Sequence, residues 1–490
     1  MSLSPRQFLK NSVWTFLDLS LYPALMILAT PLFTRQLGIS EYGLWMLIGN
    51  ITLALNFFNP GLAETNIRLI SQFRAEQDDK KIEEIIRYNF SLATALTLLA
   101  MVIGWVLSST HFIRLFDHPT FTGDEDAILL LGCVFAGLKF IEVSFISVFK
   151  GMERFDIAAR LNILSKVSVL LVNVAMAMKG CSLVPILLSS VATISLVLLI
   201  ELIVLYRFNR SWINLPSFVL LVKERKRLMN GFWYWLQGCI SLAGFLSDKM
   251  LVASLSNTVV FGYYSIASTV ATQIHTIFLA LGGFAFPRVS FKLAKQTDIM
   301  PMYFGARALI AVPGWLIITT LLLAGDAVFR LWLGEEIYAA SIVYIKLYLA
   351  FEAVMLLIIV PFHFLNGTRH IQLNSLFEII IRSMHLAGMF IGYHFFGING
   401  VLPALIITSV INIPFQYHLF HKTLLPGIHP AQSILVLLPA ILICTLCYIN
   451  YLPIQLALVA LLFYLTKVIY ANPATPYTLH LFGLRKTSRG

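Results

Sequence analysis

Charged residues are scarce in this chain, and long polar segments are missing. Asp, Glu, Lys and Arg make up 12% of its 490 residues, whereas 58% are hydrophobic. A soluble domain carries about 25% charged residues, so the composition excludes a chain of ordinary globular domains, although its length would permit several. The apolar residues instead form runs of about 20, the length at which a helix crosses the ~30 Å hydrocarbon core of a membrane. The mean hydropathy of +0.82 agrees with this interpretation.

Motifs that bind nucleotides or carry catalysis are also missing. The sequence contains no G-x-x-x-x-G-K-[ST] loop, no H-E-x-x-H helix, no G-x-S-x-G elbow and no acidic cluster spaced like metal ligands. No loop is long enough to fold as a catalytic domain. We therefore predict no catalytic residue, no metal and no cofactor, and hence no enzyme. An ion gradient or the substrate's own gradient remains as the energy source.

Fourteen apolar segments have the length of spanning helices. The predicted fold class is therefore all-α, a polytopic membrane protein with about 14 transmembrane helices. The predicted helices are 11–33, 42–66, 88–108, 127–149, 161–180, 182–206, 231–255, 258–285, 303–325, 341–365, 373–396, 398–420, 432–449 and 451–470.

The positions of the Lys and Arg residues test this helix number independently. With the N-terminus in the cytoplasm and the helices alternating, 25 of the 35 fall in cytoplasmic segments, and only Arg35, Arg114, Lys179 and Arg330 fall outside. The positive-inside rule then predicts an even number of spans with both termini cytoplasmic. We interpret the net charge of +11 as topological rather than as a sign of nucleic-acid binding, with membrane lipids as a secondary partner.

A weak internal repeat predicts two bundles. An offset of 219 residues aligns Gly43 with Gly262, and both copies contain a long helix, a short turn, a helix opened by an aromatic-Gly-aromatic triplet and a basic loop. Because the offset spans six helices, an even number, we predict a parallel repeat of two six-helix bundles around a cavity. The predicted parts are an N-terminal bundle, a C-terminal bundle and two extra helices with a tail, residues 1–215, 216–425 and 426–490.

Ionisable residues inside the predicted helices mark candidate sites, since each costs about 2.5–3.5 kcal/mol at the bilayer centre unless it faces protein or water. Asp248 and Lys249 are adjacent, so they point about 100° apart, and at least one is expected to face a wet cavity. Lys139 and Glu142 are three residues apart and share a helix face. For this second pair, a ligand site and a neutralised ion pair between helices are both open.

Further ionisable residues lie in other predicted helices. Glu378 precedes Arg382 by four residues, the favoured order for an ion pair within a helix. Asp18 lies in the inner half of the first predicted helix, and Glu64 lies near the inner end of the second. His275 lies in the middle of its helix, and we expect a hydrogen-bonded packing residue there.

Four short stretches stand out from the apolar background. They are Leu37-Gly38-Ile39-Ser40-Glu41-Tyr42-Gly43-Leu44-Trp45, Asp248-Lys249 followed by Gly262-Tyr263-Tyr264, Lys150-Gly151-Met152-Glu153-Arg154, and Gly397-Ile398-Asn399-Gly400-Val401. They resemble the bacterial polysaccharide and O-antigen flippases of the multidrug/oligosaccharidyl-lipid/polysaccharide exporter superfamily. The resemblance covers the whole chain, because helix number, loop lengths and repeat all fit.

This resemblance implies a carrier in the bacterial inner membrane that makes and breaks no covalent bond. Its cargo would be an undecaprenyl-diphosphate-linked oligosaccharide, flipped from the cytoplasmic to the periplasmic leaflet for O-antigen or another surface polysaccharide by alternating access. A polysaccharide polymerase and a chain-length regulator are candidate protein partners, and no nucleic acid is expected.

A diphosphate that leaves water needs compensating positive charge. The predicted substrate-binding residues are the cations Lys249, Lys139, Arg382 and Arg35. The residues predicted to couple an ion or to balance these charges are the acids Asp248, Asp18, Glu142 and Glu64.

Two other functions stay open. An ion-coupled multidrug antiporter of the same superfamily would use an acidic cavity, which Asp18, Glu64 and Glu352 could supply. A non-transporting scaffold of a polysaccharide assembly complex would need no wet cavity, and its charge pairs would all be satisfied internally.

Overall fold

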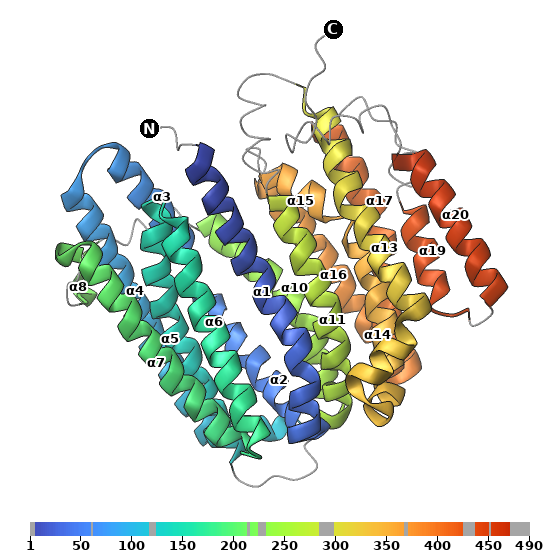
Figure 1. Ribbon diagram of the computed structural model, residues 1–490, viewed down its shortest axis with the longest axis horizontal. Helices are drawn as coiled ribbons and strands as arrows, with labels where there is room; N and C mark the ends of the chain where they lie inside the picture. Colours follow the sequence, from blue (N-terminus) through green and yellow to red (C-terminus); the bar gives the residue numbers. More distant parts are fainter. Residues whose placement is uncertain are drawn as a thin grey trace. The chain divides into compact units, whose positions relative to one another are not determined.

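Every regular element that the computed structural model describes is a helix, as the composition predicts (Figure 1). The described residues are 5–59, 62–116, 124–212, 216–223, 232–283, 298–366, 371–424, 437–449 and 452–470.

Nine helical segments within these ranges are long and apolar enough to cross a membrane. One of them, Ser375–Lys422, covers two of the predicted helices. The chain is therefore a multi-pass membrane protein, and its helices follow the apolar runs of the sequence. The number of fourteen spans stays a prediction.

Contacts divide the chain into two compact units, Met1–Ser265 and Ile266–Gly490. The division falls inside a helix rather than at residue 215, where the repeat places a boundary. The boundaries at 215 and 425 stay predictions.

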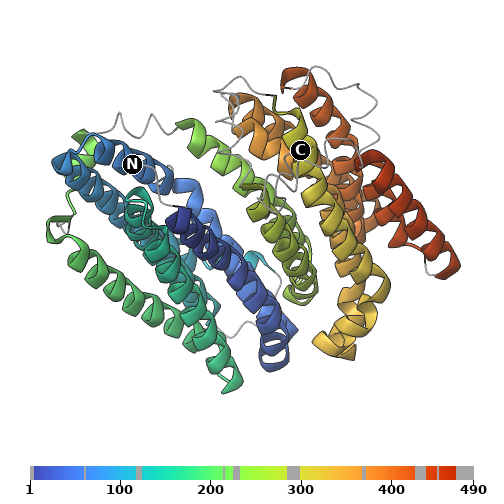
Figure 2. The same cartoon turned by 45° about the horizontal axis from the view of Figure 1, so that its top comes forward.

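The first unit is a bundle in which α4, α5, α6 and α7 run side by side (Figures 1 and 2). Its elements are α1 (Pro5–Leu37), α2 (Ile39–Ala54), η1 (Leu55–Phe58), α3 (Leu62–Ala75), α4 (Asp79–Ser109), η2 (Phe112–Leu115), α5 (Glu125–Gly151), α6 (Phe155–Met178), α7 (Leu183–Phe208), η3 (Arg210–Trp212), α8 (Phe218–Lys223), α10 (Phe232–Leu255) and the start of α11 (Thr258–Gly283).

The predicted helix 42–66 is wrong as one continuous helix, because α2 and α3 are separate. Asn59 has the extended angles φ −85° and ψ 105°. The residue before a proline is pushed out of the helical region, and Asn59 precedes Pro60 in the sequence. The Asn59 side chain then accepts a hydrogen bond from the backbone N–H of Leu62, at 2.9 Å. A side-chain oxygen in this place caps a helix start, so Asn59 ends one helix and begins the next.

A crossing of α2 over the first turns of α11 brings two backbones together. A Cβ atom on Gly43 would overlap the carbonyl oxygen of Thr258, and one on Gly262 would lie 2.6 Å from the carbonyl oxygen of Ile39. The hydroxyls of Ser40 and Thr258 are 3.0 Å apart. Position 258 follows 39, and 262 follows 43, by the same 219 residues as the sequence offset. The two helices therefore contact each other reciprocally, through equivalent positions of the proposed repeat.

The second unit contains the rest of α11 and the C-terminal helices. These elements are α13 (Met300–Leu333), α14 (Glu335–Met355), α15 (Ile359–Asn366), α16 (Ile371–Phe396), η4 (Gly397–Gly400), α17 (Val401–Leu424), α19 (Leu438–Leu446) and α20 (Leu452–Tyr470). The helices α19 and α20 lie side by side in both views (Figure 2).

The spacing Gly388-x-x-x-Gly392 predicts a close-packing face on α16, and the structure confirms it. A Cβ atom on Gly392 would lie 2.7 Å from the Cβ of Ala404 of α17, and one on Gly388 would overlap the Thr408 methyl group. Small residues at this spacing let two helix backbones approach closely.

Candidate transport site

A lysine, two glutamates and a serine meet between α5, α6 and α7 of the first unit. Lys139 pairs with Glu142 on the same helix face, as the spacing predicts. Its Nζ also donates a hydrogen bond to Ser165 Oγ of α6, at 3.2 Å. The Lys139 side chain is 33% exposed, whereas that of Glu142 is 2% exposed. Lys139, Glu142, Ser165 and Glu201 of α7 form the Lys139 cluster.

Glu201 also belongs to the Lys139 cluster, although it was not among the predicted site residues. It lies on α7, is fully buried, and interacts electrostatically with Glu142 and Lys139. Among the described residues, neither of its carboxylate oxygens has a hydrogen-bond partner, and Glu142 Oε1 has none either. The signal was present in the sequence, since Glu201 is the lone charge in the predicted helix 182–206.

A second lysine of α6 is held by a carboxylate of α1. Lys166 Nζ lies 3.0 Å from Asp18 Oδ1, and its side chain is 29% exposed. Asn162 donates hydrogen bonds to both carboxylate oxygens of Asp18, at 2.6 and 2.8 Å. The cation beside Asp18 is therefore Lys166, which was not among the predicted ligands, and the role of Asp18 in charge balance stays a prediction.

Asp248 and Lys249 are both buried and pair with each other, although adjacent residues on a helix point about 100° apart. Lys249 Nζ lies 3.6 Å from Asp248 Oδ1, and their side chains are 9% and 8% exposed. The long lysine side chain bends back along the helix, where Nζ donates a hydrogen bond to the Phe245 carbonyl at 2.8 Å and lies over the Phe245 ring. Tyr264 donates a hydrogen bond to Asp248 Oδ2 at 3.0 Å.

The remaining predicted site residues are spread over both units. Arg35 is exposed in the last turn of α1. Glu64 belongs to α3, and its side chain lies outside the described residues. Arg382 is half-buried on α16, one turn after Glu378. The roles of these residues stay predictions.

A histidine and a glutamate pair in the second unit. His275 Nδ1 of α11 lies 2.9 Å from Glu352 Oε1 of α14, and the Glu352 side chain is 5% exposed. The positive charge of Arg382 also acts on His275. The expected hydrogen bond of His275 is confirmed, and Glu352 is its partner.

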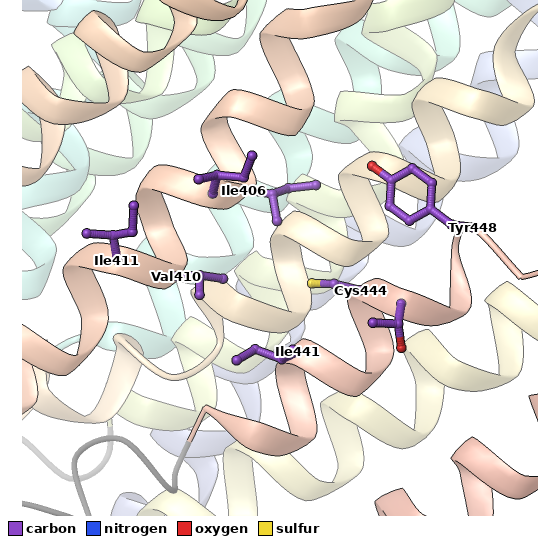
Figure 3. Close-up of a pocket in the computed structure, with 8 residues that line it drawn as sticks. Ile406, Val410, Ile411, Ile441, Cys444 and Tyr448 are labelled. Carbon is purple, nitrogen blue, oxygen red and sulfur yellow. The ribbon is translucent and has the colours of Figure 1, made fainter.

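An apolar groove of about 260 Å³ lies between α17 and α19. Figure 3 shows Ile406, Val410 and Ile411 of α17 on one side, and Ile441 and Cys444 of α19 on the other. Most of the lining side chains are apolar and none is charged, so the groove suits a hydrocarbon chain rather than a charged group.

These features define an all-α transporter fold with paired charges buried among its helices. The chain belongs to the family of polysaccharide biosynthesis proteins, whose model matches residues 8–291. No curated protein matches the chain in sequence.

Solved structures of transporters and of a flippase are similar in fold. The lipid II flippase MurJ in an inward closed conformation is 13% identical, with a TM-score of 0.67, over 96% of this chain and 99% of that chain. An inward-facing MATE multidrug resistance transporter of the MOP superfamily is 12% identical, with a TM-score of 0.61, over 88% and 97%. A MOP superfamily transporter from Pyrococcus furiosus is 14% identical, with a TM-score of 0.55, over 85% and 95%. At these identities, the likeness shows the fold alone.

Proposed function

We propose that this protein is a flippase that moves an undecaprenyl-diphosphate-linked oligosaccharide across the bacterial inner membrane for surface polysaccharide synthesis, O-antigen included. The family and the flippase-type fold support a membrane transporter in polysaccharide biosynthesis. The anionic cargo is argued from the lysines of the first unit.

One observation carries the proposal: Lys139 and Lys166 are half-exposed near the middle of their helices. Lys139 lies about 18 Å along the axis from the end of α5, and Lys166 about 16 Å from the start of α6, at 1.5 Å per residue. A lysine at this depth does not face lipid, because its charge costs several kcal/mol there. The exposed parts of both side chains therefore face water within the protein, where they are available to a diphosphate.

The geometry thus ranks the predicted ligands by access. Lys139 is the favoured ligand, and Lys166 is a second candidate ligand. The side chain of Lys249 is the least accessible of the three, at 9% exposed. The carboxylate beside each lysine balances its charge when no cargo is bound. The polyprenyl tail needs only apolar surface, such as the groove between α17 and α19.

A non-transporting scaffold is the second candidate, because Lys139, Lys166 and Lys249 all have carboxylate partners. Flipping of a fluorescent prenyl-diphosphate sugar in proteoliposomes separates the two functions. We expect the wild type to flip this lipid. Lys139→Ala should lower the flipping rate at least about tenfold, because a charge-assisted hydrogen bond is lost. Lys139→Arg should retain part of the wild-type rate. Lys346→Ala is the matched control, since Lys346 pairs with Asp326 in the other unit.

Flipping at the rate of empty liposomes by the wild type would reject the flippase and favour the scaffold. Uptake of a cationic dye in place of the anionic lipid would instead favour the multidrug antiporter.

The orientation in the membrane is a separate prediction. Reporter fusions after Lys80 and Lys226 should read cytoplasmic, and fusions after Asp124 and Glu335 should read periplasmic, because the Lys and Arg residues cluster on one side. A reversed reading at any of the four positions would show that the number of spans before it is wrong.

A further inference from the structure

The Lys139 cluster contains more acid than base. Glu201 is fully buried, and neither of its carboxylate oxygens has a hydrogen-bond partner among the described residues. The neighbouring turns of α7 are apolar: Leu198 and Leu202 pack in a hydrophobic cluster with Phe145 and Ile146 of α5. A carboxylate in such a place has no donor among the described residues to stabilise its charge.

One lysine cannot balance two buried carboxylates. Lys139 pairs with Glu142 Oε2, which leaves Glu142 Oε1 and both oxygens of Glu201 without partners. An isolated charge in an apolar interior is so costly that the group loses it by binding a proton. Two carboxylates that share one site also do not both ionise. The cluster therefore needs one proton to be neutral.

Within the part of the chain that the structure describes, no other charge facing Glu201 replaces this proton. The elements packed against α7 are α5, α6 and η3, and the charges that act on Glu201 are Glu142 and Lys139 of α5. The other nearby charged groups are engaged elsewhere: Lys166 of α6 with Asp18, Arg160 of α6 with the Trp14 ring, Asp156 of α6 with Arg154, and Arg210 of η3 with the Tyr206 ring.

We propose that Glu142 and Glu201 form a proton site linked to the anion site at Lys139, so that an anion bound to Lys139 is accompanied by a proton on this pair. The linkage rests on the function proposed above, whereas the proton on the empty cluster does not. An arriving anion competes with Glu142 for the half-exposed ammonium of Lys139. Glu142 then lies buried without a cation, and a proton from water binds to a carboxylate oxygen.

This linkage is reciprocal. If anion binding takes up a proton, lower pH must tighten anion binding, by about tenfold per pH unit for one fully linked proton. The proton offsets one of the negative charges that the diphosphate brings to the cluster.

The proton on the empty cluster can be tested without a ligand. Infrared difference spectra of the purified full chain in nanodiscs should show a protonated carboxyl band that Glu201→Gln removes. Glu153→Gln is the matched control, because Glu153 is exposed and pairs with Arg74. An unchanged band in Glu201→Gln would overturn the proton site.

The linkage needs a soluble anion, and farnesyl diphosphate is a suitable probe. Calorimetry in two buffers of different ionisation enthalpy counts the protons taken up on binding. On binding, the wild type should bind as much as one proton more than the double variant Glu142→Gln/Glu201→Gln. Any proton that the double variant still takes up belongs to the probe itself. Glu142→Gln alone, which removes the carboxylate that loses its cation, should also take up less and serves if the double variant does not fold.

The failures of the two ideas are distinguishable. Binding of farnesyl diphosphate with equal proton uptake in the wild type and these variants would overturn the linkage and leave the anion site. Absence of binding would overturn the anion site and the linkage, while the infrared measurement still decides whether Glu201 carries a proton.

Discussion

Two regions of the first unit contain charged pairs with opposite character. Where α2, α10 and α11 meet, Asp248 and Lys249 are both buried, beside the close crossing of Gly43. In the Lys139 cluster, Lys139 is 33% exposed, and three carboxylate oxygens have no hydrogen-bond partner in the described structure. Both charges of the first region are enclosed, whereas the cation of the second is partly exposed.

The comparison shows that an ionisable pair inside a membrane helix has two meanings that sequence alone does not separate. Both pairs join a lysine to a carboxylate, and both lie in apolar helices. Exposure of the cation and the number of unbonded acceptor atoms distinguish them. The following predictions test that distinction, in order of decreasing effect.

The largest effect is expected from Lys249→Ala. It leaves Asp248 buried with the Tyr264 hydroxyl, and breaking a buried pair costs about 3–5 kcal/mol. Lys139→Ala should cost less, because the Lys139 side chain is 33% exposed and the buried Glu142 carboxylate that it leaves can bind a proton. Unfolding in detergent measures both variants. If Lys249→Ala keeps wild-type stability and loses transport, Lys249 is a cargo ligand, as the sequence predicts, and the comparison fails.

A smaller loss is expected from Gly43→Ala at the crossing. Its methyl group would overlap backbone atoms of Thr258, which cannot move away as a side chain can. Overpacking of this kind costs about 1–3 kcal/mol. Gly49→Ala, on the same helix but with open space around it, is the matched control. Equal melting temperatures of the two variants would show that the two helices do not pack closely at Gly43.

The sequence predicted the fold class well because a membrane imposes one length and one composition on every span. The break at Asn59 was missed, although Pro60 was visible, since prolines also occur within membrane helices. The pairing of Asp18 with Lys166 could not be predicted, because hydropathy does not say which helices are neighbours. Glu201 was missed for a simpler reason: a search for charge pairs along one helix overlooks an acid whose partners lie on another.

The smallest effect is expected from a change at Asp78, which caps the start of α4 and pairs with an exposed lysine. Its side chain accepts a hydrogen bond from the backbone N–H of Lys81 at 3.1 Å and pairs with Lys81 Nζ at 3.0 Å. The side-chain and backbone hydrogen bonds of Lys81 lower the pKa of Asp78 below 3.8, and the same pair raises the pKa of Lys81 above 10.5. Lys81 is 51% exposed, so water and salt screen most of this attraction.

The sign of the pH dependence follows from these two directions. The contribution of Asp78 to the free energy of unfolding is present above pH 3.8 and is lost as the pH falls through the lower pKa of the folded state. The contribution of Lys81 is present below pH 10.5 and is lost as the pH rises through the higher pKa of the folded state. Asp78→Asn should therefore lower the melting temperature by no more than about 2 °C at neutral pH, and by less at either extreme. Asp79→Asn, one residue further along α4, is the control for the charge alone. A drop at Asp78 as large as that of Lys249→Ala would mean that exposure does not set the value of these pairs, and the contrast between the two regions would lose its physical basis.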